Sequence, residues 1–187
     1  MRVIAGRAGG GRLVSPKHGV RPTMDRVKAA IFSSLGEMVI GARVLDLFAG
    51  TGALGIEALS RGAESALFVE EDRQSTAAIE KNLAKTKLVG RVRQQEVFSF
   101  LKNAGTADEK FQIILADPPY DQMKSGECFT EKLLADRCLP KLLADGGLFI
   151  LEKRPSEKIP ETNFWKVTRQ KTYGATEVLF LSAIGNP

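Results

Sequence analysis

The segment Asp46–Gly52, with the sequence DLFAGTG, constrains the fold of this chain more than any other feature. It follows a short apolar run at 43–45 and precedes residues with helical spacing, so a strand is expected to turn into a helix here. Glycine tolerates positive φ and has no side chain. Gly50 and Gly52 therefore let the backbone approach a ligand and leave N–H groups near a helix N-terminus. The pattern predicts a nucleotide-binding turn.

Strand and helix patterns alternate along the chain after residue 42. Strands are expected at Arg43–Phe48, Ser65–Glu70, Val92–Gln95, Phe111–Ala116 and Leu148–Lys153, and helices at Ala53–Ser60, Gln74–Leu88 and Phe129–Leu143. Such alternation is typical of an α/β fold with a mainly parallel sheet and helices on both faces. Two later stretches rich in β-forming residues, Trp165–Lys171 and Glu177–Ser182, predict a closing antiparallel hairpin.

The first 36 residues have a different pattern. Two short extended stretches flank the glycines at 9–11 and suggest a small β-hairpin. Thr23 is then followed by apolar residues at helical spacing as far as Leu35, and Gly36 is expected to end that helix. We therefore divide the chain into a basic N-terminal hairpin and helix extension, residues 1–36, and a main domain, residues 37–187.

Composition narrows the class of protein. A chain of 187 residues with 43% hydrophobic residues is long enough for one substantial core. Its apolar runs are shorter than the ~20 residues of a membrane helix, and its first residues lack a signal-peptide core, which predicts a soluble cytoplasmic protein without a membrane partner. With Cys128, Cys138 and the single histidine His18, neither a disulfide framework nor a metal site is expected.

Positive charge is concentrated near the N-terminus. The net charge is +5, and the first 28 residues hold seven basic side chains and one acidic one, a difference of +6. A segment of this kind favours a polyanionic partner, with Arg2, Arg7 and Arg12 facing phosphates. A flexible basic tail is the alternative interpretation.

A second short segment, Asp117–Tyr120 with the sequence DPPY, follows the apolar run at 111–116. The lone pair of a base amine is delocalised into the ring, and hydrogen-bond acceptors on its two hydrogens reduce that delocalisation. Asp117 and a carbonyl beside Pro118 could supply these acceptors, because Pro118 and Pro119 stiffen the turn and donate no N–H. Tyr120 offers a face on which an extruded base can stack. The alternative is a rigid turn with a packing tyrosine.

Two acids follow predicted strands, and each has a functional and a structural interpretation. Glu70 ends a strand about twenty residues after the glycine turn, where an acid can accept hydrogen bonds from both ribose hydroxyls. The alternative is a solvated acid, like its neighbours Glu71 and Asp72. Glu96 follows the next strand and could accept from an adenine amine covered by Phe98, or it could be an ordinary surface acid.

Together, the two segments resemble motif I and the amine-methylating motif of the class I S-adenosylmethionine-dependent methyltransferases. Nearly the whole chain is similar to one family, the bacterial RsmD-type 16S ribosomal RNA guanine-N2 methyltransferases. The matching pieces are Gly6-Arg7, Gly11-Arg12-Leu13, Arg21-Pro22-Thr23, Asp25-Arg26-Val27, Leu45–Arg61, Val69-Glu70, Asn82-Leu83, Asp117–Tyr120 and Tyr173-Gly174.

The resemblance implies a Rossmann-like sheet of seven strands with the last one antiparallel, and S-adenosylmethionine as methyl donor. It implies that residues 37–187 form the methyltransferase domain and that the acceptor is guanine N2 in small-subunit ribosomal RNA, free or in an assembly particle. The residues expected in catalysis are Asp117, Pro118, Pro119 and Tyr120. Those expected to bind cofactor are Asp46, Phe48, Gly50, Thr51, Gly52, Glu70, Glu96, Thr23 and Arg26, and those expected to bind RNA are Arg2, Arg7, Arg12 and Arg21.

The element containing Thr23 and Arg26 has two possible roles, RNA binding or closure over the methionine end of the cofactor. Many relatives carry Asp or Asn where this chain has Glu96, whose side chain is longer. A monomer is expected. The competing functions are an adenine-N6 DNA methyltransferase, for which the chain lacks room for a target-recognition domain, a protein-glutamine methyltransferase, whose motif begins with Asn, and a non-catalytic cofactor-binding assembly factor.

Overall fold

The computed structural model describes residues 1–15, 23–104, 109–119 and 128–185. Its strands are β1 (Arg43–Leu47), β2 (Ser65–Glu70), β3 (Arg91–Gln94), β4 (Phe111–Ala116), β5 (Leu143–Lys153), β6 (Trp165–Tyr173) and β7 (Thr176–Ala183). Its helices are α1 (Thr23–Leu35), the 3₁₀ helix η1 (Gly36–Val39), α2 (Ala53–Ser60), α3 (Arg73–Thr86), α4 (Val97–Ala104), α5 (Phe129–Ala135) and α6 (Leu139–Leu142). Within these residues, no helix has the length and apolar character to cross a membrane.

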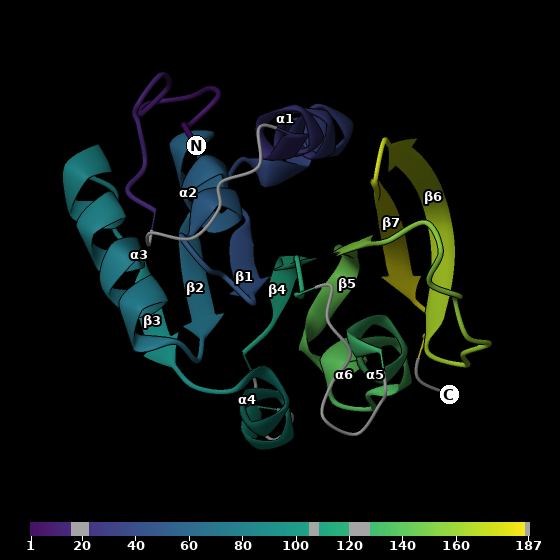
Figure 1. Ribbon diagram of the computed structural model, residues 1–187. Helices are drawn as coiled ribbons and strands as arrows, with labels where there is room; N and C mark the ends of the chain where they lie inside the picture. The colour runs from purple at the N-terminus through teal and green to yellow at the C-terminus, as the bar shows by residue number, and fades with distance from the viewer. Residues whose placement is uncertain (16–22, 105–108, 120–127, 186–187) are drawn as a thin grey trace.

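One sheet of seven strands runs through the molecule in the order β3-β2-β1-β4-β5-β7-β6 (Figure 1). The strands β1 to β5 pair in parallel, whereas β7 is antiparallel to both of its neighbours, β5 and β6. The predicted Rossmann-like sheet with an antiparallel last strand is therefore confirmed. The strand order reverses between β1 and β4, and ligands of open α/β sheets bind beyond the carboxyl ends of strands at such a switch point.

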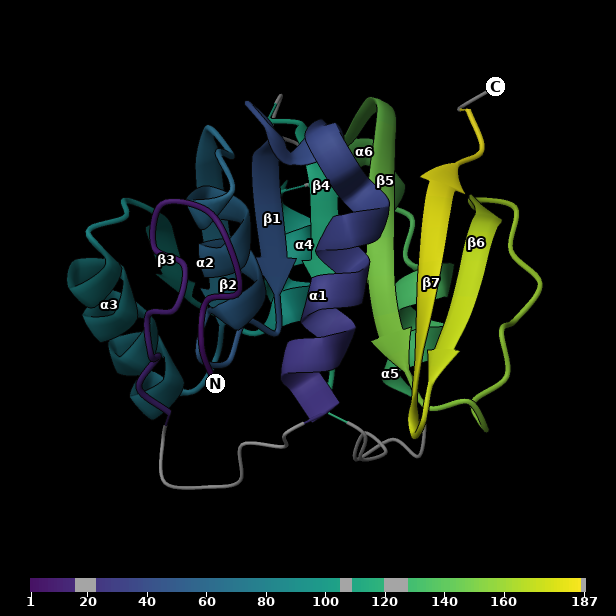
Figure 2. The same ribbon diagram turned by 90° about the horizontal axis from the view of Figure 1, so that it is seen from above.

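Helices cover both faces of the sheet and form two cores. On one face α1, α2, α3 and the N-terminal residues pack against strand residues such as Ile113 and Leu115. On the other face α4, α5 and α6 pack against alternate residues such as Ile114 and Ala116. Figures 1 and 2 show the two helical layers, with α1 crossing in front of β4 and β5 in Figure 2. We call the layer with α1 the α1 face.

Three local predictions about helices and strands need correction. Helix α4 was not predicted, because its eight residues follow directly on the acid that was interpreted as a ligand. The single helix expected at 129–143 is two short helices, because the Asp136 carboxylate accepts the N–H groups of Cys138 and Leu139 and starts a new helix there. Strand β5 consequently begins at Leu143, earlier than expected.

The N-terminal residues form the predicted hairpin, which we call the arm (residues 1–14). Arg2 and Arg12 face each other in an antiparallel bridge, with Val3 N–H donating to Gly11 O at 2.9 Å. Val3 is fully buried and Leu13 nearly so, both in the core of the α1 face. The arm is therefore part of the folded core, and the alternative of a flexible tail is wrong.

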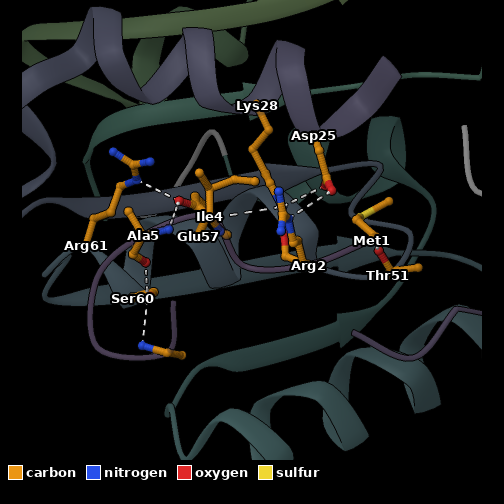
Figure 3. A network of polar contacts seen from close by, with 12 residues as sticks. Met1, Arg2, Ile4, Ala5, Asp25, Lys28, Thr51, Glu57, Ser60 and Arg61 are labelled. Carbon is orange, nitrogen blue, oxygen red and sulfur yellow. Dashed lines mark hydrogen bonds and ion pairs between the residues drawn. The ribbon is translucent and has the colours of Figure 1, made fainter. Parts of the chain in front are cut away.

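The buried carboxylate of Glu57 on α2 anchors the arm (Figure 3). Its oxygens accept the N–H groups of Ile4 at 2.6 Å and Ala5 at 3.1 Å, so this side chain satisfies two backbone donors of the arm. Arg61 donates to the same carboxylate at 2.7 Å, and the ammonium of Lys28 on α1 lies 3.8 Å away. One side chain thus joins the arm, α1 and α2.

The end of α2 makes a second set of contacts with the arm. The hydroxyl of Ser60 donates to Ala5 O at 2.6 Å and accepts from Ala8 N–H at 2.9 Å (Figure 3). Gly6 adopts φ +83°, and a Cβ placed there would lie 1.9 Å from the carbonyl oxygen of Ser60. The arm can approach α2 this closely because residue 6 has no side chain.

A matched pair of glycine substitutions tests this close approach. Gly6 and Gly10 have nearly the same positive φ, +83° and +81°, but a Cβ at Gly10 meets nothing within 4 Å. Gly10→Ala should lower the free energy of unfolding by about 1–2 kcal/mol through backbone strain alone. Gly6→Ala should lose roughly 1–3 kcal/mol more, or release the arm, because of the clash. Urea unfolding and the rate of tryptic cleavage after Arg7 measure the two effects, and equal behaviour of the two variants would argue against the docked arm.

Candidate active site

A cavity of about 300 Å³ opens at the carboxyl ends of the central strands. This volume lies in the range of small-molecule binding pockets. The described residues that line it are Phe48, Glu70, Glu71, Glu96, Val97, Asp117, Pro119 and Phe129. The structure therefore brings together four of the acids and aromatics predicted from separate segments, namely Phe48, Glu70, Glu96 and Asp117.

The glycine turn between β1 and α2 forms one side of this cavity. Three of its residues have positive φ, namely Phe48 at 55°, Gly50 at 55° and Gly52 at 75°. A Cβ on Gly52 would come within 3.2 Å of Ile56 and Ile79, so a side chain there would be crowded as well as strained by the positive φ. Positive φ is costly for a phenylalanine, and strain of this kind clusters at functional sites. The turn therefore holds backbone strain at the edge of the cavity, which makes it a candidate for ligand binding.

Glu70, at the end of β2, holds the glycine turn in place. One oxygen of its carboxylate accepts the N–H of Gly50 at 2.8 Å, and the other accepts the N–H of Asp72 at 2.9 Å. Each carboxylate oxygen has two lone-pair sites, so both oxygens can still accept from a ligand hydroxyl. The geometry is compatible with the predicted ribose contact, which stays a prediction. Asp72 instead caps α3 by accepting the N–H of Ser75.

Glu96 has a structural role that sequence reasoning missed. Its carboxylate accepts the N–H groups of Phe98 at 2.8 Å and Ser99 at 2.7 Å and so caps the start of α4. Partial burial alone would raise the pKa of Glu96, but these two N–H groups and the nearby Lys132 ammonium outweigh it and hold the pKa below its ordinary value. Glu96 also lines the cavity, so it is an ionised acid there.

Three phenylalanines form an aromatic wall beside the acids. The ring of Phe48 lies edge-on to Phe98 at 6.3 Å and to Phe129 at 5.4 Å, and Phe98 and Phe129 are nearly parallel at 6.4 Å. The Lys132 ammonium lies 4.0 Å from the centre of the Phe98 ring. Sequence reasoning missed Phe129, because it lies at the start of a helix far from either motif, and it also missed Glu71 in the lining.

Two acids are buried behind the cavity. Asp46 on β1 is 1% exposed and accepts the N–H of Gly55 on α2 at 2.8 Å, so it supports the glycine turn from beneath rather than lining the cavity as described. Burial, opposed by that hydrogen bond and assisted by Asp117 and Glu70, raises the pKa of Asp46 to about 8. The pKa of Glu152 on β5 is also raised, by burial and then by Asp117 and Asp46.

The expected RNA-binding and lid residues whose side chains the structure describes are not in the lining of this cavity. Arg2, Arg7 and Arg12 are exposed on the arm, and Arg26 is exposed on α1. Arg21 and Tyr120 lie outside the described residues, as does the side chain of Thr23. Thr51, in the glycine turn, donates its hydroxyl to the sulfur of Met1 at 3.5 Å and thus contacts the arm.

Asp46 should couple stability to pH. Its carboxyl stays protonated in the folded protein up to about pH 8 but ionises near pH 3.8 in the unfolded chain. Between these values the folded state binds the extra proton, so stability falls as pH rises. Asp46→Asn cannot ionise and still accepts from Gly55. We expect its free energy of unfolding, relative to the unchanged protein, to increase steadily from pH 4 to pH 8 in urea titrations. A pH-independent difference would refute the assigned protonation.

Comparisons with known proteins agree on one family. The family model described as "Conserved hypothetical protein 95" matches residues 1–182. YlbH of Bacillus subtilis (strain 168) is 37% identical over 182 residues, covering 95% of this chain and 96% of that protein. Ribosomal RNA small subunit methyltransferase D of Escherichia coli (strain K12) is 37% identical over 177 residues, covering 93% and 85%.

A solved structure extends this likeness to the fold. The Escherichia coli protein yhhF superposes with a TM-score of 0.80 at 32% sequence identity, covering 98% of this chain and 97% of that one. The match includes the arm as well as the sheet, because nearly the whole length of both chains is aligned. The chain therefore belongs to the RsmD-type family, to which ribosomal RNA small subunit methyltransferase D of Escherichia coli also belongs.

Proposed function

We propose that this protein transfers a methyl group from S-adenosylmethionine to the exocyclic N2 amine of a guanine in small-subunit ribosomal RNA. The observation that carries the proposal is the position of Asp117 and Pro119 at the end of β4, on the same cavity as the strained glycine turn and Glu70. The carboxylate proposed to accept a hydrogen bond from the amine and the residues proposed to bind the nucleoside of the cofactor thus share one cavity. Family membership supports the same activity.

The lining of the cavity fits an adenosine-containing cofactor. Glu70 has lone-pair sites for ribose hydroxyls, and Phe48 and Phe129 in the lining, with Phe98 packed against both rings, offer an apolar surface for a flat base. The capping oxygens of Glu96 lie on the same cavity and can accept from an adenine amine. Bound there, S-adenosylmethionine would supply a methyl group activated by its positively charged sulfur.

Asp117 is the residue proposed to orient the acceptor amine. Its side chain is half-buried, and Pro118 beside it is buried and stiff. Accepting one amine hydrogen weakens the delocalisation of the nitrogen lone pair into the ring and aims it at the methyl group. Positioning of this kind can contribute on the order of 7–11 kcal/mol without a covalent intermediate. The guanine has to leave its stack first, and Tyr120 is proposed to stack on it.

The arm is proposed to hold the RNA backbone. Arg2 and Arg12 are opposite each other in a bridge without hydrogen bonds between the two residues themselves, the arrangement in which side chains approach most closely. Like charges placed opposite each other are destabilising. The Asp25 carboxylate, 3.8 Å from the Arg2 guanidinium, offsets part of that cost, and a phosphate between the two arginines would offset more of it. Arg7 and Arg21 are proposed to add to this surface. Such a substrate places the enzyme in the cytoplasm, where ribosomal subunits assemble.

Parallel assays with three substrates test the function. Small-subunit ribosomal RNA, duplex DNA and a release factor are each incubated with enzyme and labelled S-adenosylmethionine, and the products are digested to nucleosides or amino acids. We expect label in N2-methylguanosine from the RNA alone. Label in N6-methyladenine or in methylglutamine would favour the competing methyltransferases. Cofactor binding without transfer to any substrate would indicate an assembly factor.

Asp117→Ala separates the proposed catalytic role from cofactor binding. Removing one positioned electrostatic contact typically costs a factor of about 10²–10³ in rate. We expect single-turnover methylation of RNA to fall at least a hundredfold while calorimetry gives an unchanged S-adenosylmethionine affinity. A rate close to that of the unchanged protein would remove Asp117 from the catalytic role, and a parallel loss of affinity would place it in the cofactor site instead.

A further inference from the structure

Strand β6 forms an edge of the sheet with unusual exposure. Seven of its nine residues are exposed, and only Trp165 is buried. The strand carries three basic side chains, Lys166, Arg169 and Lys171, and no acidic one. It belongs to neither segment from which the activity was inferred.

A β-bulge places these three cations on the same face of the sheet. Val167 pairs with Leu181, but the next paired residue is Arg169, opposite Phe180, so Thr168 is the extra residue. In a regular strand Lys166 and Arg169 would point to opposite faces, because side chains alternate with a period of two. With the bulge, the three cations pair with alternate residues of β7, namely Ser182, Phe180 and Val178. Paired residues point to the same face, so all three cations lie on one face of the sheet.

This face is the α1 face. Phe180 and Val178 belong to the core formed by α1, α2, α3 and the arm, whereas their neighbours Leu179 and Leu181 belong to the opposite core. Figure 2 looks at this side of the molecule, with the arm, α1 and the β6–β7 hairpin all toward the viewer. The arginines of the arm and the cations of β6 therefore flank α1, where Arg26 is exposed.

The charges on β6 are not neutralised by the described part of the protein. No ion pair joins Lys166, Arg169 or Lys171 to a carboxylate among the described residues. The acid nearest in register, Glu177, is paired with Lys153 at 2.7 Å. The guanidinium of Arg169 lies 5.7 Å from the centre of the Phe180 ring, a contact that holds it over the sheet.

The direction of β6 connects this row with the cavity. Because β6 and β5 are both antiparallel to β7, they run the same way, and their carboxyl ends lie at one edge of the sheet. Asp117 follows the carboxyl end of β4 at this same edge, since β4 and β5 are parallel. The row of cations therefore runs toward the edge where the acceptor amine is to be presented.

We propose that Lys166, Arg169 and Lys171 on the α1 face of β6 form a second RNA-backbone contact. It lies on the same face of the sheet as the arm, but toward the opposite end of the strand order. This inference rests on the proposed function, because it assigns the surface to the same RNA substrate. The bound RNA strand contacts the protein on both sides of the extruded guanine. Its phosphates neutralise a row of positive charges that have no ion-pair partner among the described residues. The competing explanation is that charged residues protect an edge strand from pairing with other chains.

Two triple variants with the same change in net charge test the proposal. In the first, Lys166, Arg169 and Lys171 are all replaced by Gln. In the control, three exposed residues of the opposite helical layer are replaced by Gln: Lys102 on α4, Arg137 between α5 and α6, and Lys141 on α6. The dissociation constant for small-subunit ribosomal RNA is measured over a series of salt concentrations. S-adenosylmethionine affinity, oligomeric state and the single-turnover rate at saturating RNA are measured for each protein.

The β6 variant should bind RNA more weakly, and its log–log salt slope should fall by about two to three units, since each lost phosphate contact removes roughly 0.7–0.9. Its cofactor affinity and saturated rate should be unchanged, and the control variant should keep the original slope.

Equal slopes for the two variants would assign the effect to net charge and overturn the proposal. Normal RNA binding with new self-association would instead support edge protection. If the unchanged protein binds ribosomal RNA but methylates none, the proposed function fails, whereas this surface is still tested by the slopes.

Discussion

The buried carboxylate of Glu57 is the interaction on which the arrangement of this molecule depends. It is 0% exposed and accepts two N–H groups of the arm and the guanidinium of Arg61, with the Lys28 ammonium close by. Burying a charge is costly unless it is paired and fully hydrogen-bonded, and here the partners come from the arm, from α1 and from the end of α2. Burial lowers the pKa of Lys28, and Glu57 and Asp25 work against that shift. Loss of the carboxylate would leave several polar groups without a partner at once.

A second buried polar side chain links the arm to the glycine turn. The amide of Asn82 on α3 accepts the N–H of Val14 at 2.6 Å and donates to the carbonyls of Val14 at 2.9 Å and Thr51 at 3.0 Å. The arm thus contacts the turn that shapes the cavity as well as α2. In the proposed function, the surface that holds RNA and the turn that holds the methyl donor are therefore linked through Asn82 and through the contact of Met1 with Thr51.

Local patterns predicted the elements well. Strand β2 and helix α2 have the expected bounds, because each is specified by its own residues and α2 begins directly after the glycine turn. The roles of Glu57 and Asn82 could not be predicted, since their partners lie more than 50 residues away in the sequence or depend on how α3 meets the arm. Glu96 was identified as a site residue, but its capping of α4 was missed. The bulge at Thr168 is fixed by pairing with β7 and leaves no local sequence signal.

The central claim is that the basic arm is an integral part of the enzyme, held by Glu57, and so presents its arginines at a fixed position. Native-state hydrogen exchange at the amides of Ile4 and Ala5 measures this most directly. We expect both amides to be protected to nearly the same degree as those of α2, and Glu57→Gln to lower their protection before that of β1. Exchange of Ile4 and Ala5 at the rate of an unstructured peptide in the unchanged protein would contradict the account.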